Sequence, residues 1–282
     1  MSRNDIIGDF GLKFKSILII FNFALIFFMV ALVFVPYSMS PAPFTGFYWT
    51  FTWPFLLILA LFFLGFNLFY IRNRRLFVLL QKEDWPALTR YLENRVIKKG
   101  SYSPRLVRLL ANTYLLLSDA AAVMSLENKA AVANPKIIDA NALIFGTARI
   151  LGGDIPGAAR FFASRKETAK GALKDWISWY CAFTLLLNRQ YEAAGKEFTF
   201  LTTVSEDKII SGLSCYFLAE NIAYLLPESK RELTETAFKG RERLQKTLSI
   251  KDWNTQTHRL ASEIHVAAIA KYLDETGRWL YR

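Results

Sequence analysis

One stretch of 56 residues, from Ser16 to Ile71, contains no charged side chain. This run constrains the fold more than any other feature, because about 20 apolar residues in a helix are enough to cross the core of a bilayer. Ser16 to Val35 and Trp53 to Ile71 each have about this length. The segment between them contains Pro41 and Pro43, which interrupt helices. The sequence therefore predicts two membrane-spanning helices joined by a turn.

The second span is expected to begin at Trp53-Pro54, because proline is favoured in the first turn of a helix. Aromatic residues cluster around the turn, as they do at membrane interfaces. A buried hairpin in a soluble protein and a cleaved signal peptide are the two alternatives. The length of the first run and the presence of a second favour membrane spans, since the apolar part of a signal peptide has about 7–15 residues.

The positions of lysine and arginine predict the orientation of the spans, because basic residues accumulate on the cytoplasmic side. Arg3, Lys13 and Lys15 precede the first span, and the turn has no basic residue. The basic residues that follow the second span most closely are Arg72, Arg74, Arg75 and Lys82. We therefore expect a multi-pass protein of the plasma (inner) membrane with both termini in the cytoplasm.

The net charge of +11 is unevenly distributed along the chain. Between Arg72 and Arg108 there are ten Lys or Arg and three Asp or Glu residues. Nucleic acid and anionic lipid headgroups are the competing partners for such a segment. Its place directly after the second span favours lipid headgroups, and no nucleic-acid partner is expected.

Helical patterns fill the chain after the spans, and the expected fold class is all-α. The expected organisation is a cytoplasmic N-terminal segment (1–15), a two-helix transmembrane hairpin (16–71), helical repeats (72–204), and further helices with a C-terminal cap (205–282). Residues 136–151 and 252–280 are each expected to form one continuous helix. Short gaps between the helices predict antiparallel helix hairpins.

The hairpins repeat along the chain. Their second helices are expected to open at Asp84, Asp119, Asp154 and Gln190, with spacings of 35, 35 and 36 residues. The residues that match between the units are the small Ala111, Gly146 and Ala182, and the small-then-aromatic pairs Ala158 with Phe162 and Ala194 with Phe198. Over about residues 72–203 the chain resembles the tetratricopeptide repeat (TPR) family. The resemblance implies a TPR-like solenoid of helix hairpins, and a non-repetitive helical bundle is the alternative.

A search for catalytic chemistry finds no Gly-rich phosphate loop, nucleophile elbow or HExxH motif. His258 and His265 would lie about 10 Å apart along one helix, too far to share a metal ion. Cys181 and Cys215 lie in apolar runs and are expected to be buried free thiols. We assign no catalytic, cofactor-binding or metal-binding residue, and we expect neither an enzyme nor a cofactor.

The TPR resemblance implies that the first helices of the repeats line a groove that binds a partner protein. The residues that its register places in this groove are Arg108, Asn112, Leu143, Ile144, Thr147, Trp176, Trp179, Tyr180 and Phe183. Arg108 and Asn112 resemble half of a clamp for a C-terminal carboxylate, but the other half is absent. An apolar or amphipathic helix is therefore the expected ligand. The alternative is that the four aromatic residues pack against the chain's own C-terminal helix.

These observations predict a membrane-anchored TPR-like scaffold or adaptor that binds partner proteins at the cytoplasmic face. The alternative is an assembly or regulatory subunit of a larger membrane complex, with the transmembrane helices as its interface. A carrier is disfavoured because no ionisable residue lies within the spans, where Asn22 and Asn67 are the strongly polar residues.

Overall fold

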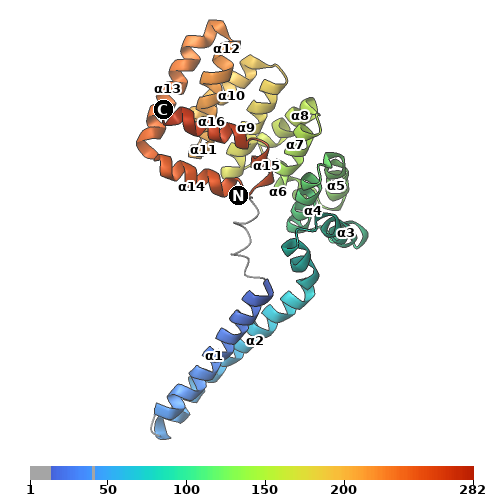
Figure 1. Ribbon diagram of the computed structural model, residues 1–282, viewed down its shortest axis with the longest axis vertical. Coiled ribbons are helices and arrows are strands. Elements are labelled where there is room, and N and C mark those ends of the chain that lie inside the picture. Colours follow the sequence, from blue (N-terminus) through green and yellow to red (C-terminus); the bar gives the residue numbers. More distant parts are fainter. Residues whose placement is uncertain (1–13, 40–41) are drawn as a thin grey trace, which may run out of the picture. The chain divides into compact units, whose positions relative to one another are not determined.

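The computed structural model describes residues 14–39 and 42–282. Within these residues the secondary structure is helical and no β-strand occurs, which confirms the all-α prediction. The chain divides into two compact units, with the boundary in the sequence between Tyr91 and Leu92 (Figure 1). Each unit is described by itself.

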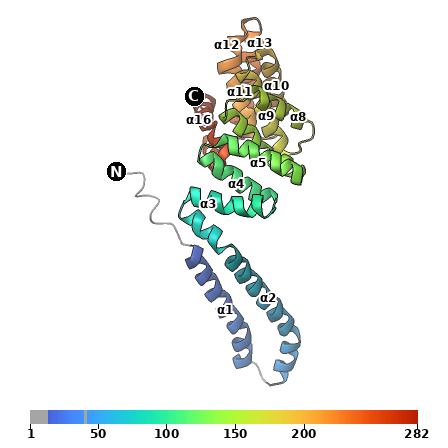
Figure 2. The ribbon, with the colours of Figure 1, turned by 90° about the vertical axis from the view of Figure 1, so that its right-hand side faces the viewer.

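The N-terminal unit is built on two long apolar helices, α1 (Phe14–Met39) and α2 (Ala42–Gln81). They lie antiparallel and side by side (Figure 2). Both are long and apolar enough to cross a membrane, over Leu18–Val35 and Thr52–Gln81. Large apolar side chains on them face outward, including Phe23 at 73% exposure.

The connection between the two helices is shorter than predicted. Because α1 continues to Met39 and α2 begins at Ala42, Pro54 lies inside α2 and does not start it. The predicted helix breaker Pro41 lies outside the described residues, and Pro43 falls in the first turn of α2, where proline is tolerated. Proline in the interior of an apolar helix is common in membrane proteins, because neighbouring groups satisfy the carbonyl that it leaves free.

The two polar residues of the apolar helices bind each other. The side-chain amide of Asn22 donates to Asn67 Oδ1 at 2.9 Å, and that of Asn67 donates to Asn22 Oδ1 at 3.0 Å. Asn67 also donates to the carbonyl of Phe63 at 2.9 Å. Each amide is therefore satisfied inside the hairpin, which fixes the register between α1 and α2.

Helix hairpins follow α2. Helix α3 (Trp85–Glu93) continues as a π-helical turn, η1 (Asn94–Lys98). The next three hairpins are α4 (Pro104–Leu116) with α5 (Ala120–Ala133), α7 (Ala142–Leu151) with α8 (Ile155–Lys166), and α9 (Ala172–Leu187) with α10 (Tyr191–Val204). The fourth hairpin has two longer arms. Its first arm is α11 (Lys208–Phe217), which continues through η2 (Leu218–Ile222) and α12 (Ala223–Leu225). Its second arm is α13 (Lys230–Thr247), which follows the short helix η3 (Pro227–Ser229).

The four hairpins of the C-terminal unit stack in chain order. Helix α7 packs on α4 and α5, α9 packs on α7 and α8, and α11 packs on α9 and α10 (Figure 1). One hairpin alone leaves an apolar face uncovered, and stacking on a neighbour buries it. This arrangement is the predicted antiparallel helix-hairpin solenoid.

Four turns share one backbone geometry: those between α2 and α3, α4 and α5, α7 and α8, and α9 and α10. Each contains a residue with a positive φ, between 53° and 80°, two positions before the next helix begins; these residues are Glu83, Ser118, Gly153 and Arg189. The following residue donates its N–H to the carbonyl five positions earlier in each case, as in Asp119 to Tyr114 and Asp154 to Arg149. Such a left-handed residue ends a helix by satisfying its last carbonyls.

Aspartate caps reinforce three of these turns. Asp84, Asp119 and Asp154 each accept an N–H from the backbone three residues later, at 2.9–3.1 Å. Gln190 occupies the fourth position without a side-chain cap. These local signals explain why the predicted starts of the second helices agree with the structure to within one residue.

The small residues of the predicted repeat lie where helices approach closely. Gly146 on α7 faces Phe162 on α8, and a Cβ atom at position 146 would overlap the phenylalanine ring. Ala111 and Ala182 are fully buried at the matching places in the neighbouring hairpins. The small-then-aromatic residues Ala158, Phe162, Ala194 and Phe198 are also fully buried.

Two helices predicted as continuous are broken in the structure. Residues 136–151 form α6 (Lys136–Ala140) and α7, because the buried Asn141 interrupts them and uses its side chain to bind neighbouring backbone. Residues 252–280 form three helices, α14 (Ile250–Leu260), α15 (Ile264–Ala267) and α16 (Ala270–Leu280). The breaks let this segment turn back along the stack, where α14 and α16 pack on α11 and α15 packs on α7.

Candidate ligand pocket

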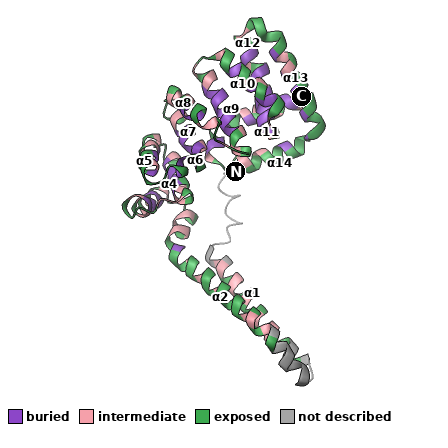
Figure 3. Cartoon of the chain, turned by 180° about the vertical axis from the view of Figure 1, so that it is seen from behind, coloured by how far each residue is buried: buried purple, intermediate pink, exposed green. Residues whose placement is uncertain are grey.

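The four aromatic residues predicted to line a groove are buried instead. Trp179 and Tyr180 have no exposed surface, and Trp176 and Phe183 are each 6% exposed. Figure 3 shows the buried residues along α9 in purple. Trp179 stacks on Phe183 with the ring centroids 5.2 Å apart. The prediction of an open aromatic groove is therefore corrected: this face of α9 belongs to the core.

The covering surface comes from the C-terminal end of the chain. The ring of Tyr272 on α16 lies 6.0 Å from that of Phe183, and Tyr180 donates its hydroxyl to the carbonyl of His265 at 2.6 Å. Burial raises the pKa of Tyr180, so this phenol stays a donor. We call residues 261–269 the C-terminal strap. The aromatic residues of α9 therefore pack against the chain's own C-terminal helices, which is the alternative to an open groove.

The remaining predicted groove residues lie beside the strap. Arg108 and Asn112 on α4, together with Leu143 and Ile144 on α7, line a cavity of about 310 Å³. Thr147, one turn further along α7, is fully buried. The strap contributes the other side of the cavity through Ser262, Glu263, Ile264 and His265. The structure thus joins four predicted groove residues to a segment that the register did not include.

Arg108 is held in place by the break between α6 and α7. Its Nε donates to Asn141 Oδ1 at 3.1 Å, and its Nη2 donates to the carbonyl of Ala140 at 2.9 Å. Asn141 is itself anchored, because its amide donates to the carbonyls of Ile137 and Pro104 at 2.9 and 3.3 Å. A guanidinium group has five N–H donors. Arg108 is therefore oriented by two hydrogen bonds and keeps donors for a ligand.

His265 is a deeply buried polar residue of the cavity, with 5% of its surface exposed, and Asn141 is buried further, at 2%. Burial and the positive charge of Arg108 lower the pKa of this imidazole to about 4, so it is neutral at pH 7. Its Nδ1 lies 3.3 Å from Glu263 Oε2. The neutral ring carries a single proton, so one of its two nitrogen atoms is a donor and the other is an acceptor.

Two polar side-chain atoms of the lining residues have no hydrogen-bond partner within the described chain. They are His265 Nε2 and Asn112 Oδ1. Both are shielded from solvent and therefore lie beneath the surface of the cavity, out of reach of a molecule bound in it. A buried polar atom without a partner costs about 1–3 kcal/mol.

The lining of the cavity combines Arg108, Glu263 and a neutral imidazole with aliphatic side chains. Among the residues that the structure describes, no group of three or more His, Cys, Asp or Glu side chains is arranged to hold a metal ion. Cys181 and Cys215 are free and buried, as predicted.

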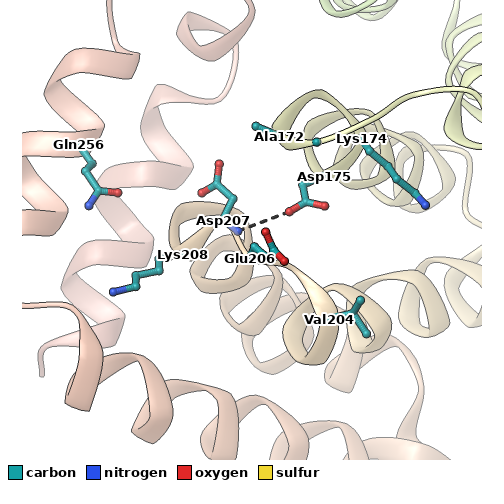
Figure 4. A pocket seen from close by; sticks show the side chains of 9 residues that line it. Ala172, Lys174, Asp175, Val204, Glu206, Asp207, Lys208 and Gln256 are labelled. Carbon is teal, nitrogen blue, oxygen red and sulfur yellow. Dashed lines mark hydrogen bonds between the residues drawn. The ribbon is translucent and has the colours of Figure 1, made fainter.

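A second hollow lies at the start of α9 and α11, where the backbone N–H of Asp207 points to the carboxylate of Asp175 (Figure 4). Asp207 caps α11 by accepting the N–H of Ile209 at 2.8 Å, and burial raises the pKa of this carboxyl group. Asp175 accepts the hydroxyl of Ser205 at 2.7 Å and the N–H of Asp207 at 3.4 Å. The carboxylate of Asp175 therefore fastens the α10–α11 loop to α9, and that of Asp207 caps α11.

The basic residues predicted to contact lipid belong to the N-terminal unit. Arg72, Arg74 and Arg75 lie in the last turns of α2, and Lys82 follows its end; all four are exposed. The guanidinium of Arg75 lies 5.7 Å from the ring centre of Tyr91. Their exposure leaves the predicted contact with headgroups open to test.

Sequence reasoning missed Glu263 and His265, because they were placed on one continuous helix with His258. In the structure His258 is exposed on α14, whereas His265 is buried on α15. A signal was present, since Ser262-Glu263 precedes an apolar run, and polar residues in this position are typical of a helix start.

Comparison with known proteins gives a family. A family model described as "Uncharacterised Treponema protein" matches residues 122–282, more than half of the 282 residues. A protein of Treponema pallidum (strain Nichols), described as "Uncharacterized protein", is 27% identical over 280 residues, which cover 96% of this chain and 89% of that protein. No solved structure matches the chain at a significant level. The matched region includes the strap and the hairpins from α5 onward, and the chain therefore belongs to the family described as "Uncharacterised Treponema protein".

Proposed function

We propose that this protein is a membrane-anchored scaffold whose TPR-like repeats bind partner proteins at the cytoplasmic face. The observation that carries the proposal is the repeated hairpin turn, which recurs at Glu83, Ser118, Gly153 and Arg189 with one backbone geometry. Repeats of two antiparallel helices at this spacing resemble the TPR family, whose proteins bind other proteins. The close contact of Gly146 with Phe162 supports the same register.

Membrane anchoring is supported by the surface of α1 and α2. Their apolar side chains are exposed over the length of a bilayer, and such a surface needs lipid or protein to cover it. The exposed Arg72, Arg74 and Arg75 at the end of α2 suit anionic headgroups on the cytoplasmic side. Reporter fusions after residue 45 and after residue 100 should report opposite compartments. The same compartment for both fusions would refute a membrane hairpin with two cytoplasmic termini.

The strap narrows the surface on which a partner can bind. It covers the α9 face, and the accessible part of the predicted groove is the part around Arg108, Asn112 and Leu143. We therefore expect the partner contact on α4 and on the start of α7.

Co-purification from mild detergent tests the scaffold proposal. The full chain should retain partner proteins, and Arg108→Glu should reduce their recovery. Arg105→Glu is the matched control, because Arg105 is exposed on the same helix and does not line the cavity. Absence of any stable partner, or equal recovery with both variants, would contradict the proposal.

The second candidate is an assembly subunit that uses α1 and α2 as its interface. Gly65 on α2 favours it, because no other atom of the described chain lies within 4 Å of the place of its missing Cβ, so a second helix can approach there. Asn22 and Asn67 already hydrogen-bond to each other within the hairpin. Gly65→Leu should abolish co-purification if the interface lies in the membrane, and should leave it unchanged if the repeats bind the partner.

A further inference from the structure

Two opposite charges line the same cavity without pairing. Arg108 lies on α4 and Glu263 on the strap, and no ion pair within 4.0 Å joins Arg108 to any carboxylate of the described chain. Glu263 is 58% exposed in its side chain and uses one oxygen on His265. Both charges are therefore free to bind a ligand that carries a negative and a positive group.

The cavity that Arg108 and Glu263 line also has aliphatic walls. Leu143 and Ile144 come from α7, Leu173 from the start of α9, and Ile264 from the strap. The volume of about 310 Å³ lies at the lower end of the range of about 300–1,000 Å³ that small-molecule sites occupy. Such walls suit a compact aliphatic body.

The two charges indicate which groups the ligand carries. An ammonium group supplies three donors, and its charge is balanced by Glu263. The N–H groups of Arg108 that the chain leaves unused suit a carboxylate.

We propose that this cavity binds a free aliphatic L-α-amino acid as its zwitterion. The carboxylate pairs with Arg108, and the ammonium group pairs with Glu263. The side chain lies on Leu143, Ile144 and Leu173. This site goes beyond the scaffold function, because its ligand is a small molecule that joins α4 to the strap.

Calorimetric titration of the purified full chain in lipid nanodiscs tests the proposal. The probes are L-leucine, 4-methylpentanoate, which lacks the ammonium group, and 3-methylbutylamine, which lacks the carboxylate. Leucine should bind, and each analogue should bind about tenfold more weakly or worse, since a hydrogen-bonded charge contributes about 1.5–3 kcal/mol and a factor of ten corresponds to about 1.4 kcal/mol. No binding of leucine at about 1 mM, or equal binding of either analogue, would overturn the proposal.

Variants locate the site. Arg108→Gln and Glu263→Gln should each weaken leucine binding about tenfold or more. Arg105→Gln and Glu242→Gln are the matched controls, since both residues are exposed and lie outside the cavity, and both variants should bind as the unchanged chain does. Thermal unfolding of each variant checks its fold. Unchanged affinity in Arg108→Gln would overturn the assignment. Because no partner protein is present, this outcome is independent of the scaffold test.

Discussion

Gly146 on α7 lies against the ring of Phe162 on α8, with no room for a side chain between them. A Cβ atom on Gly146 would come within 2.6 Å of Cε2 of Phe162, closer than real carbon atoms approach. Phe162 is fully buried, and its ring stacks on Tyr180 with the centroids 5.2 Å apart, so it has no free space to move into. The hairpin therefore requires glycine at this position.

Replacing Gly146 by leucine should overpack the α7–α8 hairpin and lower the free energy of unfolding by about 1–3 kcal/mol. Gly146→Ala should have a smaller effect that Phe162→Leu partly relieves, because the shorter side chain opens the space. The coupling energy of this double-mutant cycle should be about 0.5–3 kcal/mol. Denaturant unfolding followed by circular dichroism measures each value. Additive effects of the two changes would mean that the contact is absent.

Trp179→Ala should lower the free energy of unfolding by about 3–5 kcal/mol, because the indole has no exposed surface and its removal leaves a cavity. The same measurement on Phe200→Ala provides the control, since Phe200 on the neighbouring α10 is 50% exposed. If the Trp179→Ala protein melts like the unchanged chain, the α9 face is an open groove and does not belong to the core.

His265 should make the protein less stable as the pH falls. The unfolded imidazole takes up a proton near pH 6.5, whereas the folded one does so only near pH 4. Because the folded pKa is the lower of the two, the contribution of this group is complete above about pH 6.5 and is lost toward pH 4, by about 3 kcal/mol in total.

Thermal unfolding at about pH 7 and about pH 5 tests this dependence. The drop in melting temperature between the two should be smaller in His265→Gln than in the unchanged chain. His258→Gln is the matched control, because His258 is exposed. Arg108 and Glu263 are present in every variant compared, so an equal drop in His265→Gln and the unchanged chain would assign the acid sensitivity to other groups.

Asn22→Leu and Asn67→Leu should each weaken the α1–α2 hairpin, because each change leaves the other amide without its partner. Hydrogen bonds between apolar helices in a membrane contribute on average about 0.6 kcal/mol and at most about 1.7 kcal/mol. The double leucine variant should be no less stable than either single variant. Titration of the full chain with SDS, followed by circular dichroism, provides the comparison, and a double variant with the summed loss would contradict the pairing.

Local signals explain how much of the fold could be predicted. Asp119 and Asp154 cap the helices that they open, and the residue before each has the conformation that ends a helix, so the turns are encoded within a few residues. The repeat spacing and the buried small residues follow from these turns. The short connection between α1 and α2 was missed because Pro54 is a helix breaker in water and a tolerated residue in an apolar helix.

Only one side of the candidate pocket could be predicted from the sequence. Arg108 and Asn112 follow from the register of α4, but Glu263 and His265 reach them from more than 150 positions away along the chain. The aromatic face of α9 was ambiguous for the same reason. Periodicity shows that Trp176, Trp179 and Tyr180 share a face, and it does not show what covers that face.

The strap changes how the stacked hairpins hold together. In an open array each hairpin touches only its neighbours, so the array can lose its end units one at a time. Here the segment from α14 to α16 contacts α7, α9 and α11, including a hydrogen bond between residues 85 positions apart. Opening any of these hairpins breaks contacts with the returning segment as well. The three hairpins that begin with α7, α9 and α11 therefore unfold as one cooperative unit, and they fold more slowly than an open array of the same length, because distant parts of the chain must meet first.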